Sequence, residues 1–287
     1  MIKLIVFFSL ITSFALIMGC EDPVPTDYVP EYFVEGYLKV GEPVNNVILM
    51  LAQPIQGSFV YDSALIPNAD VRLISDDGSF QLDFKYGDQP GYYYADENYL
   101  VKPDMKYRLE VRIDGSYLYA ETKTPAGMIN WITDAPERIQ YPKDTLDLPK
   151  SSEVLSWTDL EGTGYYPLSV KCLDTAEYGI YFDDVPDNEM NRRVYRPWLD
   201  DDDYNERTTY TLVPNTEVNV VWSVFRWYGL HEVNVMAADD NFVRWFLQNV
   251  ASNSYNELLS SVKGDGIGGF GSVAMVKDTF LLVKNQP

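Results

Sequence analysis

The chain has 287 residues, of which 46% are apolar and 14% aromatic, so it is long enough and apolar enough to bury a substantial core. Its 43 acidic residues outnumber 22 basic ones, and the net charge of −21 repels nucleic acid and anionic lipid surfaces. This balance excludes nucleic-acid binding and predicts that any membrane contact depends on acyl chains rather than on a basic patch.

The first twenty residues have the pattern of an export signal. Lys3 precedes an apolar run over residues 4–18, which is shorter than the roughly 20 residues that a membrane-spanning helix needs. The run ends at Gly19-Cys20, and residues 16–20 (LIMGC) resemble a lipobox, the site at which a bacterial lipoprotein is diacylated and cleaved. We therefore expect residues 1–19 to be removed and Cys20 to carry lipid. The alternative is an ordinary secreted protein with an incidental cysteine.

A tether and a first β domain are expected next. Residues 20–30 (CEDPVPTDYVP) are acidic and proline-rich, which favours an extended, solvated segment. Residues 31–125 alternate short apolar and aromatic runs with turn residues, and Asp114-Gly115 predicts a tight hairpin. This pattern is typical of a prealbumin-like or fibronectin-like sandwich. Seven strands are expected, over residues 32–40, 44–52, 69–75, 80–86, 92–95, 107–113 and 117–123.

After a proline-spaced connector (126–149), residues 150–287 predict a second β-rich domain. A long acidic and aromatic insertion, residues 174–206, interrupts it. The predicted fold class is therefore all-β with a minor helix, as two sandwich-like domains in series. Strands are expected over residues 154–157, 165–173, 208–213, 218–227 and 231–237.

One segment, about residues 239–262, is predicted to be helical. Asp239 or Asp240 can cap a first helix, and a second short helix is expected over residues 255–262. The chain then predicts two strands, 269–276 and 279–283, that turn near Lys277-Asp278. The apolar stripe of the first helix consists of Phe242, Val243, Phe246, Leu247 and Val250.

Residues 263–272 (KGDGIGGFGS) are rich in glycine. They are not a phosphate-binding loop, because no Gly-Lys-Ser/Thr follows and the segment lies between a helix and a strand. We expect the glycines to permit positive φ angles and close backbone approach at the start of a strand, with Phe270 packed between layers.

The order of these segments resembles a known family. The export signal is followed by YFVEGYLKVGEPVNNVILMLAQP, then by ETKTPAG, and near the end by the glycine-rich segment. This arrangement resembles the Bacteroidetes lipoprotein family of domain of unknown function 4249. The resemblance implies an outer-membrane or surface lipoprotein, often encoded beside a TonB-dependent transporter, and it supplies no catalytic residues. Glu21-Asp22 also resembles the surface-export signal of Bacteroidetes lipoproteins.

The sequence gives little support for a catalytic, metal-binding or cofactor-binding site. His231 is the single histidine, so every Ser-His-Asp or Cys-His mechanism would need it as base. It shares a strand face with Val233, Val235 and Ala237, which indicates a structural histidine at the boundary of a sheet. Cys172 alternates with apolar neighbours and is interpreted as a small core residue. We predict no catalytic residue, no cofactor and no zinc, copper or iron site.

The insertion holds the best candidate binding surface, because Tyr, Trp and Arg dominate binding hot spots. A variable loop that folds onto its own sandwich is the alternative. Asp200 and Asp202 are weak Ca²⁺ candidates, but the EF-hand spacing is absent and a solvated acidic loop is favoured. The candidate surface comprises Tyr178, Tyr181, Arg192, Arg193, Tyr195, Arg196, Trp198 and Tyr204.

The sequence thus favours a non-catalytic lipoprotein, anchored by its acyl chains in the outer membrane on the periplasmic or cell-surface side. Its role would be binding or accessory, with an outer-membrane transporter as a possible partner. One alternative is a glycan-binding module or a glycoside-directed enzyme. Another is a structural envelope protein.

Overall fold

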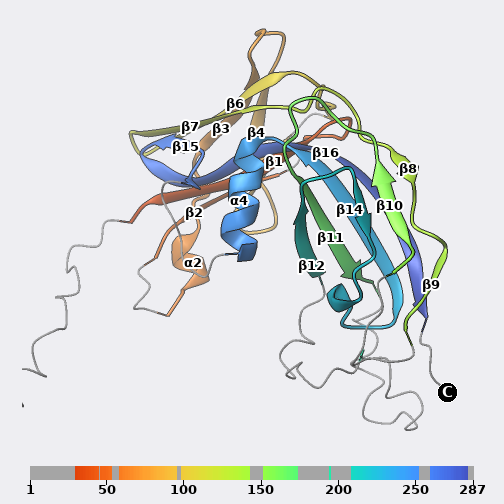
Figure 1. The fold of residues 1–287 in the computed structure, drawn as a ribbon. Helices are drawn as coiled ribbons and strands as arrows, with labels where there is room; N and C mark the ends of the chain where they lie inside the picture. The colour runs from red at the N-terminus through yellow and green to blue at the C-terminus, as the bar shows by residue number, and fades with distance from the viewer. Residues whose placement is uncertain are drawn as a thin grey trace, which may run out of the picture.

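The computed structural model describes residues 30–44, 46–53, 58–95, 98–142, 151–173, 194, 208–251 and 259–283. Thirteen of the described strands form one large sheet, with strand order β12-β11-β14-β16-β1-β2-β5-β4-β3-β6-β7-β15 and β9 paired to β16 (Figure 1). A smaller sheet has the order β13-β10-β8. Within the described residues, no helix is both long and apolar enough to cross a bilayer.

The seven strands expected in residues 31–125 all form, because their apolar side chains alternate with polar ones along each run. A short helix, α2 (Tyr61–Ala64), lies between the second and third. The strands are β1 (Tyr32–Lys39), β2 (Val47–Leu51), β3 (Asp70–Ser75), β4 (Gln81–Tyr86), β5 (Tyr92–Ala95), β6 (Lys106–Ile113) and β7 (Ser116–Lys123).

The later strands, from residue 131 onward, accompany helix α4 (Asp240–Ala251) and the 3₁₀ turn η3 (Trp222–Val224). They are β8 (Trp131–Thr133), β9 (Arg138–Gln140), β10 (Val154–Trp157), β11 (Tyr166–Cys172), β12 (Thr208–Val213), β13 (Glu217–Asn219), β14 (Gly229–Ala238), β15 (Val262–Gly264) and β16 (Gly266–Val283).

Strand β16 joins the two halves of the large sheet. Its first part runs parallel to β1, from Gly266 to Val273, and its second part runs antiparallel to β14. The predicted hairpin at Lys277-Asp278 is therefore wrong. These two residues stay in the ladder because the carbonyl of Lys277 accepts the indole N–H of Trp131 at 3.3 Å, and the carboxylate of Asp278 accepts the N–H of Ala135 at 3.1 Å.

Two other predictions also fail. The strand expected over residues 218–227 ends at Asn219 and gives way to η3. Trp222 and Phe225 are both buried in one core, which a strand cannot achieve for residues three apart but a 3₁₀ turn can. The second helix was expected to reach Val262, which instead pairs with Ala120 as part of β15.

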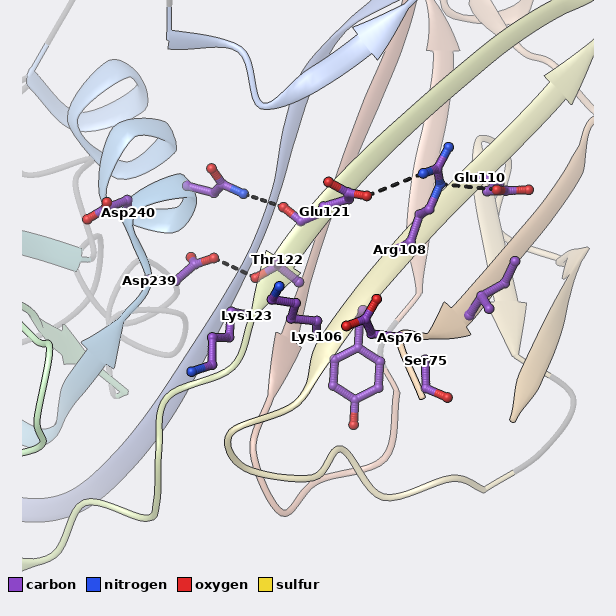
Figure 2. A pocket seen from close by; sticks show the side chains of 13 residues that line it. Ser75, Asp76, Lys106, Arg108, Glu110, Glu121, Thr122, Lys123, Asp239 and Asp240 are labelled. Atoms are coloured by element: carbon purple, nitrogen blue, oxygen red, sulfur yellow. Dashed lines mark hydrogen bonds and ion pairs between the residues drawn. The ribbon is translucent and has the colours of Figure 1, made fainter. Parts of the chain in front are cut away.

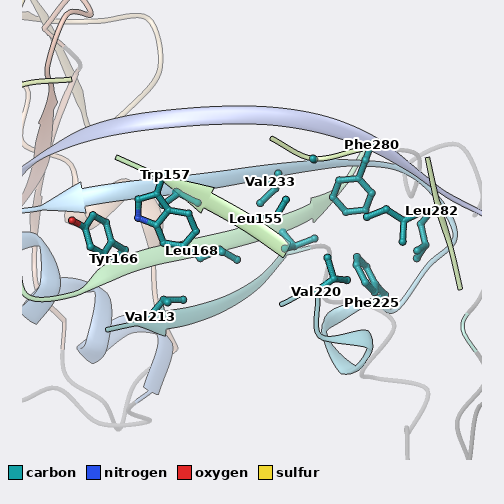
Figure 3. Close-up of a cluster of buried hydrophobic side chains, with 14 of the residues drawn as sticks. Leu155, Trp157, Tyr166, Leu168, Val213, Val220, Phe225, Val233, Phe280 and Leu282 are labelled. Atoms are coloured by element: carbon teal, nitrogen blue, oxygen red, sulfur yellow. The ribbon is translucent and has the colours of Figure 1, made fainter. Parts of the chain in front are cut away.

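Each half of the sheet has its own apolar core. The first core packs side chains of β1 to β7 together with Val262 and Phe270, so Phe270 is buried as expected. The second core lies between the C-terminal part of the large sheet and the smaller sheet, around Trp157 and Phe280 (Figure 3). Because β16 supplies residues to both cores, the division into two domains in series stays a prediction.

The glycines of residues 263–272 allow β15 to lie close to β7 and β16 to lie close to β1. Gly268 has φ +131°, and a Cβ there would lie 1.9 Å from the carbonyl oxygen of Val34. Gly264, at φ +93°, would bring a Cβ within 2.2 Å of the carbonyl oxygen of Tyr117. Both positions require glycine, as the sequence predicts.

Candidate functional site

Helix α4 is fixed at its first turn by Asp239, which confirms one of the two predicted caps. The Oδ1 atom of Asp239 accepts the backbone N–H groups of Phe242 at 2.9 Å and Ser272 at 3.0 Å. The hydroxyl of Thr122 donates to Oδ2 at 2.5 Å. One carboxylate therefore ties together α4, β16 and β7.

The environment of Asp239 is structural rather than reactive. Burial raises the pKa of its carboxyl above the ordinary value, although the hydrogen bonds from Thr122, Ser272 and Phe242 lower it. Both oxygens are engaged in holding backbone and hydroxyl donors. Asp239 thus stabilises the start of α4, at the edge of a cleft that it also lines.

A cleft of about 620 Å³ lies between strands β6 and β7 and the first turn of α4 (Figure 2). We call it the charged cleft, because Lys106 and Lys123 line it together with Asp76, Glu121 and Asp240. The side-chain amide of Asn241 donates to the carbonyl oxygen of Glu121 at 2.7 Å. This hydrogen bond joins α4 to β7 at the cleft.

Ion pairs hold the outer wall of the charged cleft. The guanidinium of Arg108 lies 3.1 Å from Glu110 and 3.3 Å from Glu121, and it stacks on the ring of Tyr119 at 4.2 Å from the centroid. These partners satisfy the charge of Arg108 within the wall itself. The lining of the charged cleft is therefore more polar than that of a typical small-molecule site, with charges that already pair within the wall.

A second cleft, of about 360 Å³, lies where the apolar face of α4 meets the neighbouring strands β1, β11, β12, β14 and β16. We call it the aromatic cleft. Phe242 of α4 meets Tyr37 of β1 edge-to-face at 5.6 Å, and Phe246 meets Tyr210 of β12 at 5.7 Å. Trp245 completes the aromatic lining.

Polar groups of the strands face the same space. The side-chain amide of Asn234 donates to Glu232 at 3.1 Å and to the hydroxyl of Ser169 at 3.3 Å. Lys39 and Lys171 add positive charge. An aromatic lining with a few convergent polar groups is the usual composition of a small-molecule site, so the aromatic cleft is the better candidate for binding.

The aromatic cleft adjoins the two ends of the insertion. Lys171, next to the end of β11, pairs in register with Thr208, the first residue of β12, and both line the cleft. Between these strands the structure describes Val194, which is fully buried in the second core and whose N–H donates to the carbonyl of Arg226 at 2.9 Å. Cys20, Asp200, Asp202 and the eight residues of the candidate surface lie outside the described residues.

His231 and Cys172 are core residues, as expected. The ring of His231 stacks on Phe280 with centroids 5.5 Å apart, and only 2% of the residue is exposed. Cys172 lies directly opposite His231 in the neighbouring strand, a pairing that sequence reasoning missed. Both side chains are buried, so neither is accessible to a substrate.

Sequence reasoning also missed the aromatic cleft, since its lining comes from segments as distant as Tyr37 and Trp245. The sequence does hold one local signal of this cleft. Trp245 is a large aromatic residue of α4 that does not belong to the apolar stripe of the helix. Among the described residues, no three His, Cys, Asp or Glu side chains gather as a metal site.

Comparison with known proteins establishes the family. The sequence profile of the family described as "Domain of unknown function (DUF4249)" matches residues 21–263, well over half of the chain. The chain therefore belongs to this family. Among curated proteins, no sequence matches the chain.

Solved structures with similarity include fibronectin domains. A two-domain fibronectin type-III segment of chicken tenascin is 13% identical, covers 72% of this chain and 90% of its own, and has a TM-score of 0.18. The FN1–FN3 domains of chicken CNTN1 are 10% identical, cover 90% of this chain and 66% of their own, and have a TM-score of 0.18. TM-scores this low carry no argument about the fold. The mostly β, sandwich-like fold class is therefore assigned from the strands described above.

Proposed function

We propose that the protein is a lipid-anchored outer-membrane lipoprotein of the Bacteroidetes, facing the periplasm or the cell surface, and that it binds a ligand or partner without catalysis. The lipobox at Cys20 and membership of the family support the anchor. The acidic composition agrees with attachment through acyl chains, because a chain of net charge −21 is repelled by anionic lipid.

The composition of the aromatic cleft is the main support for the proposed binding role. It combines rings from α4, β1 and β12 with the amide of Asn234 and the charges of Lys39 and Lys171. Its single carboxylate is Glu232, which already accepts from Asn234. This composition suits recognition of a ligand and supplies no general acid and base in a pair.

A transporter barrel is the proposed partner, and the insertion is the proposed contact. The aromatic and arginine residues of 174–206 are of the types that dominate protein interfaces. Because the aromatic cleft adjoins the ends of this insertion, a ligand held there would be presented next to the partner.

The test is co-purification from detergent-solubilised outer membranes with the tagged native protein. We expect a transporter barrel to co-purify, and we expect a variant with Arg192, Arg193 and Trp198 replaced by alanine to lose it. The exposed Gln81→Ala on β4 serves as the matched control. A protein that emerges alone, or a barrel retained equally by all three proteins, contradicts the accessory role.

Glycan binding is the second candidate, because a sugar can stack its apolar face on Tyr210 or Trp245 while Asn234 and Glu232 bond its hydroxyls. Hydrolysis is disfavoured, since it needs two carboxyl groups about 5.5 Å or roughly 6.5–9.5 Å apart. Tyr210→Ala should abolish any glycan-array signal of the native protein. A structural envelope role, the third possibility, predicts a deletion strain with a weakened envelope and normal nutrient uptake.

A further inference from the structure

The chain leaves the sheet at a defined place. The carbonyl oxygen of Glu31 accepts the N–H of Ala52 at 2.8 Å, and Tyr32 lies opposite Leu51 at the end of the β1–β2 pair. The tether, residues 20–30, therefore starts at this end of the sheet. Eleven residues span at most about 40 Å, so Cys20 and its acyl chains stay within that reach of Glu31.

An exposed apolar cluster lies at the same end. The exposed fractions are 61% for Phe59, 54% for Val60, 41% for Tyr61 and 39% for Tyr94. We call these four residues the apolar tip. Scattered exposed apolar residues are ordinary, but three in succession at the start of α2, with a fourth that is linked to them through Gln89 and Pro90, form a patch.

Specific hydrogen bonds hold the apolar tip in place. The side-chain amide of Gln53 donates to the carbonyl oxygen of Val60 at 2.6 Å, and its oxygen accepts the N–H of Val60 at 2.7 Å. The hydroxyl of Tyr61 donates to the carbonyl of Pro90 at 2.7 Å. The tip is thus a fixed display of side chains rather than a loose loop.

These bonds also place the apolar tip beside the exit of the tether. Gln53, which holds Val60, directly follows Ala52, which bonds to Glu31. Tyr94 joins them because its hydroxyl bonds to Gln89 at 3.2 Å, next to the Pro90 that holds Tyr61. Figure 1 shows α2 and the start of β1 at the same side of the molecule.

We propose that the apolar tip inserts into the interface of the bilayer that anchors Cys20, and so fixes the orientation of the protein on the membrane. The inference rests on the proposed lipid anchor. Aromatic rings with a polar hydroxyl suit the headgroup region, where one end is apolar and the other wet. Asp62 and Glu31 lie beside the tip, so the surface that it enters is zwitterionic rather than anionic.

This orientation leaves the binding surfaces free. Tyr37 and Lys39 of the aromatic cleft lie at the end of β1 opposite to Tyr32, and the second half of the sheet continues further from the tip. With the tip in the interface, the aromatic cleft, most of whose lining lies on α4 and the second half of the sheet, stays free of the lipid. Contact with the membrane and contact with a partner therefore use different ends of the molecule.

The test is the membrane depth of a spin label on the lipidated protein in phosphatidylcholine vesicles. The label is attached at Val60→Cys, and at Ile132→Cys on β8 as a control that is 69% exposed. Cys172 is buried and Cys20 carries lipid, so each variant has one reactive thiol. We expect the label at position 60 to collide with oxygen dissolved in lipid at least threefold more than with a nickel complex in water, and the reverse at 132.

Equal access of the nickel complex to both labels would overturn the inference. Shielding of position 60 from both reagents in native outer membranes would also overturn it, since a protein would then cover the tip. The mass of the N-terminal peptide tests the anchor separately. A Cys20 without acyl chains would overturn the proposed anchor and the orientation with it, whereas an acylated Cys20 with a water-exposed tip would overturn the orientation alone.

Discussion

At the scale of single residues, Asp239 is the main polar residue that holds the first turn of α4 in place. It caps α4 and also holds the N–H of Ser272 and the hydroxyl of Thr122, both of which are buried. Removal of the carboxyl group would leave the buried N–H of Ser272 without this acceptor, and would leave the hydroxyl of Thr122 with only the hydroxyl of Ser272 as acceptor. That loss costs more than the loss of an exposed helix cap.

We therefore expect Asp239→Ala to lower the free energy of unfolding by about 2–4 kcal/mol. Asp239→Asn keeps an acceptor oxygen and avoids a buried charge, so its cost should stay within about 1 kcal/mol. Urea denaturation of both variants measures the difference. Equal loss in the two variants would show that the acceptor geometry of Asp239 is not what holds α4.

Glu35 gives a prediction about pH. It lies on β1 under α4, where burial raises the pKa of its carboxyl and Trp245 partly offsets the rise. The native state then binds this proton more tightly than the unfolded chain does, so ionisation of Glu35 reduces stability as pH rises above the ordinary carboxylate range.

Glu35→Gln should therefore be at least as stable as the native protein at pH 7, and the difference should shrink as the pH falls toward 4. Unfolding in urea at several pH values measures it. A variant that is less stable than the native protein at pH 7 and equal to it at pH 4 would contradict the sign of this effect.

At the scale of elements, the contact between β16 and β1 depends on Gly268. Its positive φ and the 1.9 Å approach of a Cβ to the carbonyl of Val34 leave no room for a side chain. We expect Gly268→Ala to cost at least about 3 kcal/mol of unfolding free energy. Gly78, with φ +63° and open space around it, is the control for backbone strain alone.

Gly78→Ala should cost only about 1 kcal/mol, because it adds strain without a clash. Thermal denaturation of both variants gives the comparison. If the two alanine variants lost the same stability, the close approach of β16 to β1 would not be a constraint on the fold.

The elements also show what the sequence can predict. Strands β1 to β7 and the start of α4 follow from local signals, namely alternation of apolar residues and a capping aspartate. The continuity of β16 does not, because Lys277-Asp278 has the composition of a turn and is kept extended by non-local contacts with β14, Trp131 and Ala135. The aromatic cleft is equally non-local, since β1 is joined to β11 and β12 in the sheet only through β16 and β14.

At the scale of the whole molecule, β16 couples the two halves. All six tryptophans lie after residue 126, and among the described ones Trp245 also contacts β1, so tryptophan fluorescence reports mainly on the second half of the chain. Leu73, by contrast, lies on β3 and is fully buried in the first core. A change there reaches the tryptophans only if the halves unfold together.

We expect Leu73→Ala, which should cost about 2–5 kcal/mol, to shift the urea midpoint of the fluorescence transition as far as that of the circular dichroism transition. Phe280→Ala in the second core is the reciprocal variant. A fluorescence midpoint that does not move with Leu73→Ala would instead indicate two domains that unfold independently.

The central claim is that the aromatic cleft binds a ligand or partner, and photo-cross-linking in living cells tests it most directly. Tyr210, which is 45% exposed in that cleft, is replaced by photoreactive benzoylphenylalanine, and Ile132 on β8 is replaced in the same way as the control. We expect a cross-linked product from position 210 and none from position 132. No product from position 210, or the same product from both, would contradict it.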